Sequence, residues 1–175
     1  GMDLTIRAAE GFRPTLMFEG VPEGTVSPGQ MISLRSNGKL TLLDLDLRVV
    51  ARDDFAADRW SLFHCTGPNK VELSNVSIDF LNSVGQPAAL FDLVSETSGP
   101  ETETVSETEI SLNRVACRAE SDGFRIAAQA RGRIRLRDCG MALSGSFINN
   151  RGDSSIPSAR GIVEVLLNHV TCLTS

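Results

Sequence analysis

The chain repeats one pattern, in which two short runs of alternating apolar and polar residues are separated by a polar pair. In KVELSNVSIDF, residues 70–80, the apolar positions are odd-numbered before Ser74-Asn75 and even-numbered after it. Alternation of this kind is typical of a strand with one buried face. The change of phase predicts a corner at Ser74-Asn75, where the chain turns while both strands keep their apolar side chains facing one interior.

The same change of phase occurs along the whole chain. The units that show it begin at Leu40, Val71, Ile110, Ile134 and Val165. A longer version opens the sequence, where the apolar runs at 4–6 and 16–18 are separated by a segment that contains Gly and Pro. Asp, Asn and Ser favour such corners, because they tolerate left-handed backbone angles or bond to nearby peptide groups. We therefore expect the corners to be formed by Asp44, Asn75, Asn113, Asp138 and Asn168.

A third short apolar segment lies between successive units, as at Leu62-Phe63, Leu90-Phe91 and Phe124 with Ile126, with Phe147 expected to continue the series. Three short strands in each turn of the chain, stacked by repetition, are typical of a parallel β-helix. The sequence thus predicts an all-β fold, a parallel β-helix solenoid of about five to six coils with three short strands per coil.

The whole of residues 1–175 is expected to form this single domain. The units are unequally spaced, which indicates loop insertions at about residues 48–60, 94–109 and 149–161. A solenoid accepts such insertions because they leave the stack at the turns between strands.

Stacked coils require compatible columns, since equivalent residues lie about 4.8 Å apart. Alignment of the units predicts apolar columns, which begin with Leu40-Val71, Leu42-Leu73, Leu45-Val76 and Leu47-Ile78. Cys117, Cys139 and Cys172 fall in these columns and are therefore expected in the core. No disulfide is predicted, because Cys117 and Cys172 share a column but lie two coils, or about 10 Å, apart.

The composition, 41% hydrophobic and 22% charged over 175 residues, is that of a soluble globular domain. The net charge of −5 argues against general nucleic-acid binding, because there is no basic surplus to displace counterions. No apolar run approaches the roughly 20 residues of a membrane span, and no signal peptide is visible. Gly1-Met2 is typical of a tag remnant before an excised segment, so the compartment stays open, with an extracytoplasmic or cell-surface location favoured.

The units, such as LTLLDLDL and ISLNRVAC, resemble coils of the right-handed parallel β-helix superfamily, the pectin-lyase-like proteins. The opening LTIRAAEGFRPTLMF also resembles coils of bacterial surface proteins. The resemblance covers nearly the whole chain and implies a module of a larger bacterial protein, such as a surface protein or a receptor-like serine/threonine kinase. Lyases, hydrolases, adhesins and inert scaffolds share the architecture, so it specifies fold rather than activity. Adjoining domains or other copies are expected at the uncapped ends of the stack.

Carboxylates that could carry chemistry occur in two places. Asp53, Asp54 and Asp58 cluster in the loop at 48–60, where they could bind Ca²⁺ or, as a pair, hydrolyse a glycosidic bond. ESDGFRI, around Asp122, slightly resembles a motif of β-helix polygalacturonases. The other motifs of that family are missing, so Asp122 is interpreted as a turn residue rather than a catalytic acid.

Candidate ligand-binding residues lie on or near the third segments. Trp60 and His64 are the best surface candidates, and Asp92 and Arg125 would complete a site if the loop carboxylates converged with them. Arg135 belongs to a run of arginines at alternate positions, which would share one outer face. That face could bind an anionic sugar, although a solvated surface neutralised by glutamates is the favoured interpretation.

Three other features have simpler interpretations. The acidic loop at 94–109 could hold a cation or a partner, but a solvated insertion is favoured. Arg151-Gly152-Asp153 matches a cell-adhesion tripeptide, which also occurs often by chance. The four cysteines and two histidines lack the spacing of a zinc site, so no metal site is predicted and Ca²⁺ is the one cofactor considered.

These observations favour a non-catalytic module that binds or displays a carbohydrate or a protein partner. The alternative is a polysaccharide lyase or glycoside hydrolase that acts on an acidic polysaccharide. The chain has no Tyr and one Trp, whereas a groove for sugars usually offers aromatic platforms. Carboxylates that converge in one cleft, or a Ca²⁺ site beside a basic residue, would instead favour the enzyme.

Overall fold

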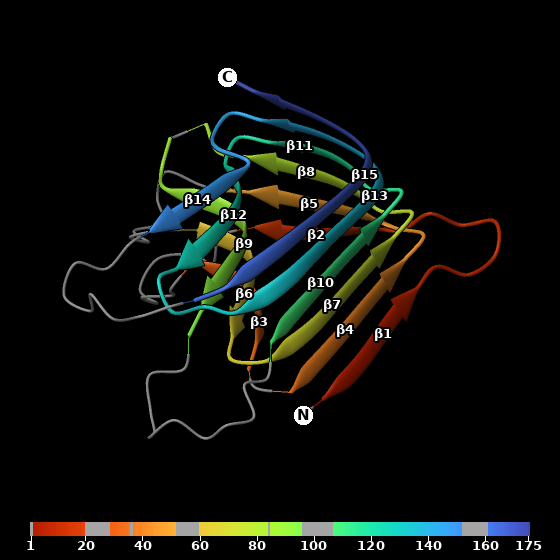
Figure 1. Ribbon diagram of the computed structural model, residues 1–175. Helices are drawn as coiled ribbons and strands as arrows, with labels where there is room; N and C mark the ends of the chain where they lie inside the picture. Colours follow the sequence, from red (N-terminus) through yellow and green to blue (C-terminus); the bar gives the residue numbers. More distant parts are fainter. Residues whose placement is uncertain are drawn as a thin grey trace, which may run out of the picture.

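The computed structural model describes residues 2–19, 29–35, 37–51, 60–83, 85–95, 107–151 and 161–175, with Arg151 described by its backbone alone. Within these residues the chain forms strands and their connections, and no helix. The strands lie in two curled sheets of ten and five strands, and every strand pairing among them is parallel (Figure 1). The prediction of an all-β chain with parallel strands is therefore confirmed.

Each of the first five repeats supplies a first and a second strand to the ten-stranded sheet and a third strand to the five-stranded sheet, and the last repeat supplies β15 to the ten-stranded sheet. The first strands are β1 (Asp3–Arg7), β4 (Gly38–Leu43), β7 (Asn69–Ser74) and β10 (Thr108–Asn113). The second strands are β2 (Thr15–Glu19), β5 (Asp46–Val50), β8 (Ser77–Leu81) and β11 (Ala116–Ala119). The third strands are β3 (Gln30–Leu34), β6 (Trp60–Thr66), β9 (Ala88–Val94), β12 (Asp122–Ala127) and β14 (Ile148–Arg151). In the last two repeats the first and second strands join, as β13 (Gly132–Leu143) and β15 (Val163–Thr174).

Successive repeats pair in the register that the sequence predicts. The confirmed columns are Leu40, Val71, Ile110, Ile134, Val165; Leu42, Leu73, Leu112, Leu136, Leu167; and Leu47, Ile78, Cys117, Met141, Cys172. Leu4 and Ile6 of the first repeat extend the first two columns. On the outer face, Glu109 lies between Lys70 and Arg133, so opposite charges are neighbours there.

The corner between first and second strands is built on one residue with a left-handed backbone. Positive φ angles of 59°, 54°, 53°, 53° and 52° occur at Asp44, Asn75, Arg114, Asp138 and His169. In these five repeats this residue is the second of the two corner residues. The expectation that Asn113 and Asn168 take this role is therefore wrong, because each lies one position too early. Arg114 and His169 take it instead, at a cost of about 1–2 kcal/mol each for a side chain that disfavours this conformation.

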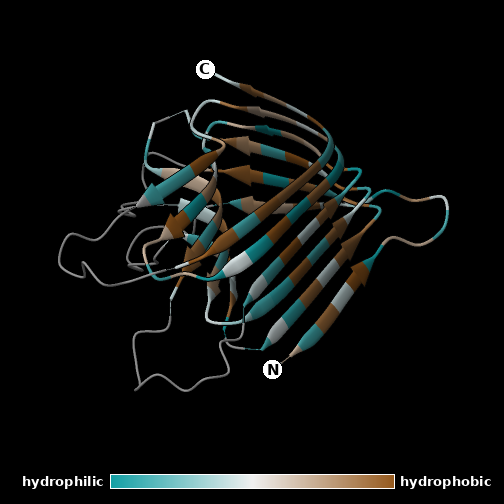
Figure 2. Ribbon diagram, in the orientation of Figure 1, coloured by the Kyte–Doolittle hydropathy of each residue, from teal (hydrophilic) through white to brown (hydrophobic). Residues whose placement is uncertain are grey.

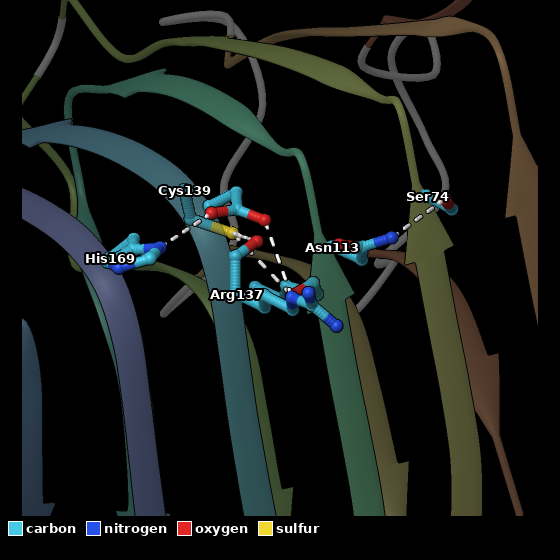
Figure 3. A network of polar contacts seen from close by, with 7 residues as sticks. Ser74, Asn113, Arg137, Cys139 and His169 are labelled. Carbon is cyan, nitrogen blue, oxygen red and sulfur yellow. Dashed lines mark hydrogen bonds and ion pairs between the residues drawn. The ribbon is translucent and has the colours of Figure 1, made fainter.

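Side chains at the corners bond to one another in two separate groups. Asn75 Nδ2 donates to Asp44 Oδ1 at 2.8 Å, and His169 Nδ1 lies 3.1 Å from Asp138 Oδ1. Arg114 stands between these groups in the stack and bonds to neither. Figure 3 shows the His169 contact and a second kind of link, in which Asn113 Nδ2 donates to Ser74 Oγ at 3.5 Å. This bond joins the residues that precede Arg114 and Asn75. Corner side chains thus bond across repeats without forming one uninterrupted ladder.

The interior is filled by apolar side chains from all three strands of each repeat. Figure 2 shows apolar and polar residues alternating along the first strands. The inward-facing apolar residues of β4, β7 and β10 are buried, whereas Leu4 of β1 is exposed. On the five-stranded sheet the rings of Phe63, Phe91 and Phe124 stack at centroid distances of 4.8 and 5.0 Å. Phe147, just before β14, meets Phe124 edge-on at 5.5 Å. The four rings of the predicted third segments therefore form one continuous column. Each aromatic pair adds about 0.5–1.5 kcal/mol to stability beyond the burial of its rings.

The last repeat leaves interior-facing side chains exposed. Among the described strands β15 pairs only with β13, and Leu167 of β15 is 54% exposed. Cys172 lies in its predicted column but is exposed, whereas Cys65, Cys117 and Cys139 are buried, and all four thiols are free. The prediction that Cys172 is a core residue is therefore wrong, because no described strand covers β15.

The cysteines should differ sharply in reactivity. Burial, with a smaller effect of the Asp92 charge, raises the pKa of Cys65 to about 12, and burial likewise raises the pKa of Cys117 to about 12. At pH 8 both thiols are inaccessible and almost wholly protonated. We expect brief iodoacetamide treatment to modify Cys172 first, as measured by peptide mass spectrometry, and to modify all four cysteines only in urea. Equal labelling rates at Cys65 and Cys172 in the folded protein would contradict the strand register that buries Cys65 and leaves Cys172 exposed.

Candidate functional site

A row of polar side chains crosses the outer face of the five-stranded sheet. The phenylalanine column faces the interior, so the residue after each phenylalanine faces outward. The strand register places these outward residues side by side, in the order Ser33, His64, Asp92, Arg125 and Asn149. The structure thus brings three of the predicted binding residues, His64, Asp92 and Arg125, together from three repeats.

Most of this outward face is buried. Leu62 has no exposed surface, and Asp92 and Arg125 are 3% and 2% exposed. Trp60 is fully buried, and its Nε1 donates to Gln86 Oε1 at 2.8 Å. The prediction that Trp60 lies at the surface is wrong, because an outward position on this sheet does not mean contact with solvent.

The imidazole of His64 is held at both ring nitrogens. Nδ1 lies 3.2 Å from Asp92 Oδ2, and Nε2 lies 3.2 Å from Thr66 Oγ1. A carboxylate at one ring nitrogen fixes the tautomer and orients the other nitrogen, which is the arrangement of an acid–base pair. Arg125 lies opposite Asp92 on the next strand, so the carboxylate stands between two basic side chains. The His64 side chain is 12% exposed, which gives a ligand little access to this row.

A pocket of about 510 Å³ opens where second strands connect to third strands in the third, fourth and fifth repeats. We call it the acidic pocket, because it contains the carboxylates of Glu120 and Asp122. Its lining consists of Asn82, Ser83, Gly85, Gln86, Pro87, Ala88, Glu120, Ser121, Asp122, Ser144 and Gly145. Carboxylates, hydroxyls and an amide thus converge on one concave surface, from connections that are distant in the sequence.

Asp122 braces one wall of the acidic pocket. Its Oδ1 accepts a hydrogen bond from the Ser146 backbone N–H at 2.9 Å, and its Oδ2 accepts one from Asn149 Nδ2 at 2.7 Å. One carboxylate oxygen is therefore engaged by the connection before β14, and the other by β14 itself. This geometry agrees with the interpretation of Asp122 as a turn residue. Asn149 also ends the polar row, so the pocket and the row are joined.

Asn82 forms the opposite wall and was not predicted from the sequence. Its backbone N–H donates to Glu120 Oε2 at 2.6 Å, and its Nδ2 donates to Gln86 O at 2.7 Å and Glu120 O at 3.1 Å. Its Oδ1 accepts from the Gln86 backbone N–H at 3.2 Å. The available signal was a buried Asn in a connection rich in Gly and Pro, a residue that bonds to nearby backbone.

The arginines of β13 lie on its outer face, as predicted. Arg133 forms a close ion pair with Glu164, and Arg137 Nε lies 3.4 Å from Asp138 Oδ2. Arg135 is exposed. Neutralisation by a glutamate is therefore found at Arg133.

Several predicted features lie outside the described residues. They are Asp53, Asp54 and Asp58, the Gly152-Asp153 part of the adhesion tripeptide, and residues 96–106 of the acidic loop. In the described ranges no three His, Cys, Asp or Glu side chains are grouped as they would be around a metal ion. Nor does this part of the chain contain a helix with the length and apolar character needed to cross a membrane.

Comparison with known proteins returns no relative of this chain. No family model, no curated protein and no solved structure matches it.

The bracing role of Asp122 can be tested by stability. Asp122→Ala removes the acceptors of the Ser146 and Asn149 hydrogen bonds, and we expect it to lower the free energy of unfolding by about 1–3 kcal/mol in urea denaturation. Ser83→Ala, at an exposed residue of the same pocket, should stay within about 0.5 kcal/mol of the unchanged protein. Equal free energies of unfolding for Asp122→Ala and Ser83→Ala would show that the Asp122 carboxylate does not stabilise this wall.

Proposed function

We propose that this chain is a right-handed parallel β-helix module that binds carbohydrate in the acidic pocket without transforming it. Three strands per repeat, one register throughout and a left-handed corner in each repeat support the β-helix. The resemblance noted in the sequence supports a place within a larger bacterial protein, at the cell surface or in a receptor.

The acidic pocket is the observation that carries this proposal. Its volume of about 510 Å³ lies within the range of small-ligand sites. Glu120, Gln86 and the serines at 83, 121 and 144 offer acceptors and donors of the kind that pair with sugar hydroxyls. Asn82, itself buried, cross-links the two sides of the pocket and keeps it pre-formed, which limits the ordering cost of binding.

The state of the carboxylates favours binding over catalysis. In a pair of carboxylates that cleaves a glycosidic bond, one must protonate the leaving oxygen. The other must activate a water or attack the sugar. Here both oxygens of Asp122 and one oxygen of Glu120 already accept hydrogen bonds from the protein. The carboxylates therefore support the walls of the pocket and leave the remaining lone pairs for sugar hydroxyls.

Two substitutions in one connection test the pocket. Ser144→Phe places a ring in the acidic pocket, because Ser144 is exposed and lines it. Ser146→Phe is the matched control, since Ser146 is exposed in the same connection but is not among the lining residues. An oligosaccharide array would select the probe, and calorimetry would then measure its affinity. We expect Ser144→Phe to weaken binding at least about tenfold and Ser146→Phe to leave it within about twofold.

Two results would overturn the assignment. One is the absence of any oligosaccharide that binds the folded protein. The other is equal weakening by Ser144→Phe and Ser146→Phe, which would place the sugar elsewhere on the surface.

An enzyme that acts on an acidic polysaccharide is the second candidate, favoured by the His64–Asp92 pair beside Arg125. For the non-catalytic module we expect no new reducing ends and no unsaturated product from acidic polysaccharides, with or without Ca²⁺. Product that is lost in His64→Ala and kept in His169→Ala would instead assign the chemistry to His64, because His169 is the other histidine of the chain.

A further inference from the structure

A second concave site lies on the outer face of the ten-stranded sheet, directly beyond the left-handed corners. It is an open concavity of about 410 Å³ with a mostly apolar lining, which includes Ala142 and the exposed Leu173. Its floor is formed by Ser77, Ala116, Gly140 and Thr171. These four residues are register neighbours on adjacent strands, and each lies two positions after the corner residue of its repeat. The site shares no lining residue with the acidic pocket and is independent of it.

Two exposed arginines border this site within one repeat. Arg118 lines it, two residues after Ala116, and Arg114 stands at the corner two residues before Ala116. Arg118 is thus the one charged residue that lines the site, and Arg114 lies next to it at the corner, before β11 begins. We call the site the arginine groove, defined by Arg114, Arg118 and the four floor residues.

The carboxylates around the arginine groove are already engaged with other basic groups. Asp46, at one end, accepts from Arg13 Nε at 2.8 Å and from the Ser77 hydroxyl. Asp79 lies 3.9 Å from Arg48 Nε.

At the corner of the next repeat, Asp138 is likewise engaged. Its oxygens lie 3.4 Å from Arg137 Nε and 3.1 Å from His169 Nδ1. Within the described part of the chain, neither Arg114 nor Arg118 forms an ion pair shorter than 4 Å. Arg118 lies opposite Asp79 in the register, and Asp79 is shared with Arg48, so the basic side chains outnumber the carboxylates around the groove. The chain as a whole has a net charge of −5.

We propose that the arginine groove binds an acidic oligosaccharide, with its carboxylate or sulfate groups held by Arg114 and Arg118. A guanidinium matches both groups with paired hydrogen bonds, so the basic side chains fit either source of negative charge. The small side chains of the floor allow a ring to approach the sheet closely.

An acidic peptide fits this surface less well. Peptides usually gain affinity on a sheet by pairing their backbone with a free strand edge. The strands beneath the central floor residues, β8, β11 and β13, are paired on both sides, so they offer no free edge there. Among the described strands of the floor, only β15 beneath Thr171 pairs on one side alone, so a peptide could pair its backbone at that end of the groove. Over Ser77, Ala116 and Gly140 a ligand must depend on side-chain contacts.

Gly140 offers a way to close the groove without disturbing the sheet. A Cβ added at Gly140 would have no other heavy atom within 4 Å, and its φ angle is not in the left-handed region. Gly140→Leu should therefore fold normally and fill the floor. Ser111→Leu, at an outward position of β10 on the other side of the corner, is the matched control.

Binding would be measured by calorimetry at low salt with a hyaluronan hexasaccharide, a sulfated dextran fragment and plain dextran. We expect the unchanged protein to bind at least one acidic probe and not plain dextran. Arg114→Asn and Arg118→Asn should each weaken binding about fivefold, and Gly140→Leu at least about tenfold. Arg133→Asn removes the same charge from β13, and should stay within about twofold. Ser111→Leu should also have little effect.

Stability separates these effects from misfolding. Asn tolerates the left-handed backbone of the corner better than Arg does, so Arg114→Asn should keep or raise the melting temperature while it weakens binding. Ser144→Phe should leave binding of the acidic probes unchanged, so a failure at this site is distinct from a failure at the acidic pocket.

Three results would overturn the proposal. The first is unchanged affinity in the variant that carries both Arg114→Asn and Arg118→Asn. The second is equal weakening by Arg133→Asn, which would mean that only net charge matters. The third is an affinity for poly-L-glutamate as high as that for the saccharides, which Gly140→Leu also weakens. That result would assign the groove to an acidic protein.

Discussion

Each corner of the stack depends on one residue with a positive φ angle. That residue shifts the alternation of side chains by one position, so that both strands present apolar residues to the same interior. Leu73 and Ile78, before and after Asn75, are 1% and 3% exposed as a result. Parallel pairing then repeats this geometry from one repeat to the next and stacks the apolar residues in columns. The core is thus fixed by a backbone angle as much as by hydrophobicity.

The two sheets use their outer faces differently. The outer face of the ten-stranded sheet carries partly exposed charges, with ion pairs of small energetic value and the arginine groove. The outer face of the five-stranded sheet is largely buried although it carries Asp92 and Arg125. Burial of charge is unfavourable unless each charge finds partners, and Asp92 meets His64 there. The acidic pocket lies at the connections between these two environments.

Much of the stack could be predicted from the sequence, because alternation and phase are visible one repeat at a time. The left-handed residue could not be placed reliably, since propensity favours Asn113 and Asn168 while geometry selects Arg114 and His169. The burial of Trp60 was missed because nothing in its local pattern shows what covers an outward position. The His64–Asp92 contact and the acidic pocket arise from the alignment of third strands and their connections, which only the folded register determines.

The break in the corner network at Arg114 has a consequence for how such a chain can change over evolutionary time. An unbroken ladder of identical side chains would tie each corner to all the others, since one substitution would disturb both neighbours. Here the left-handed residues bond in two pairs, Asp44 with Asn75 and Asp138 with His169, and Arg114 bonds to neither. Only its neighbour Asn113 bonds to the adjacent corner, at Ser74. A repeat between them is free to exchange its corner residue alone. Sequence can therefore drift repeat by repeat while the columns inside stay the same.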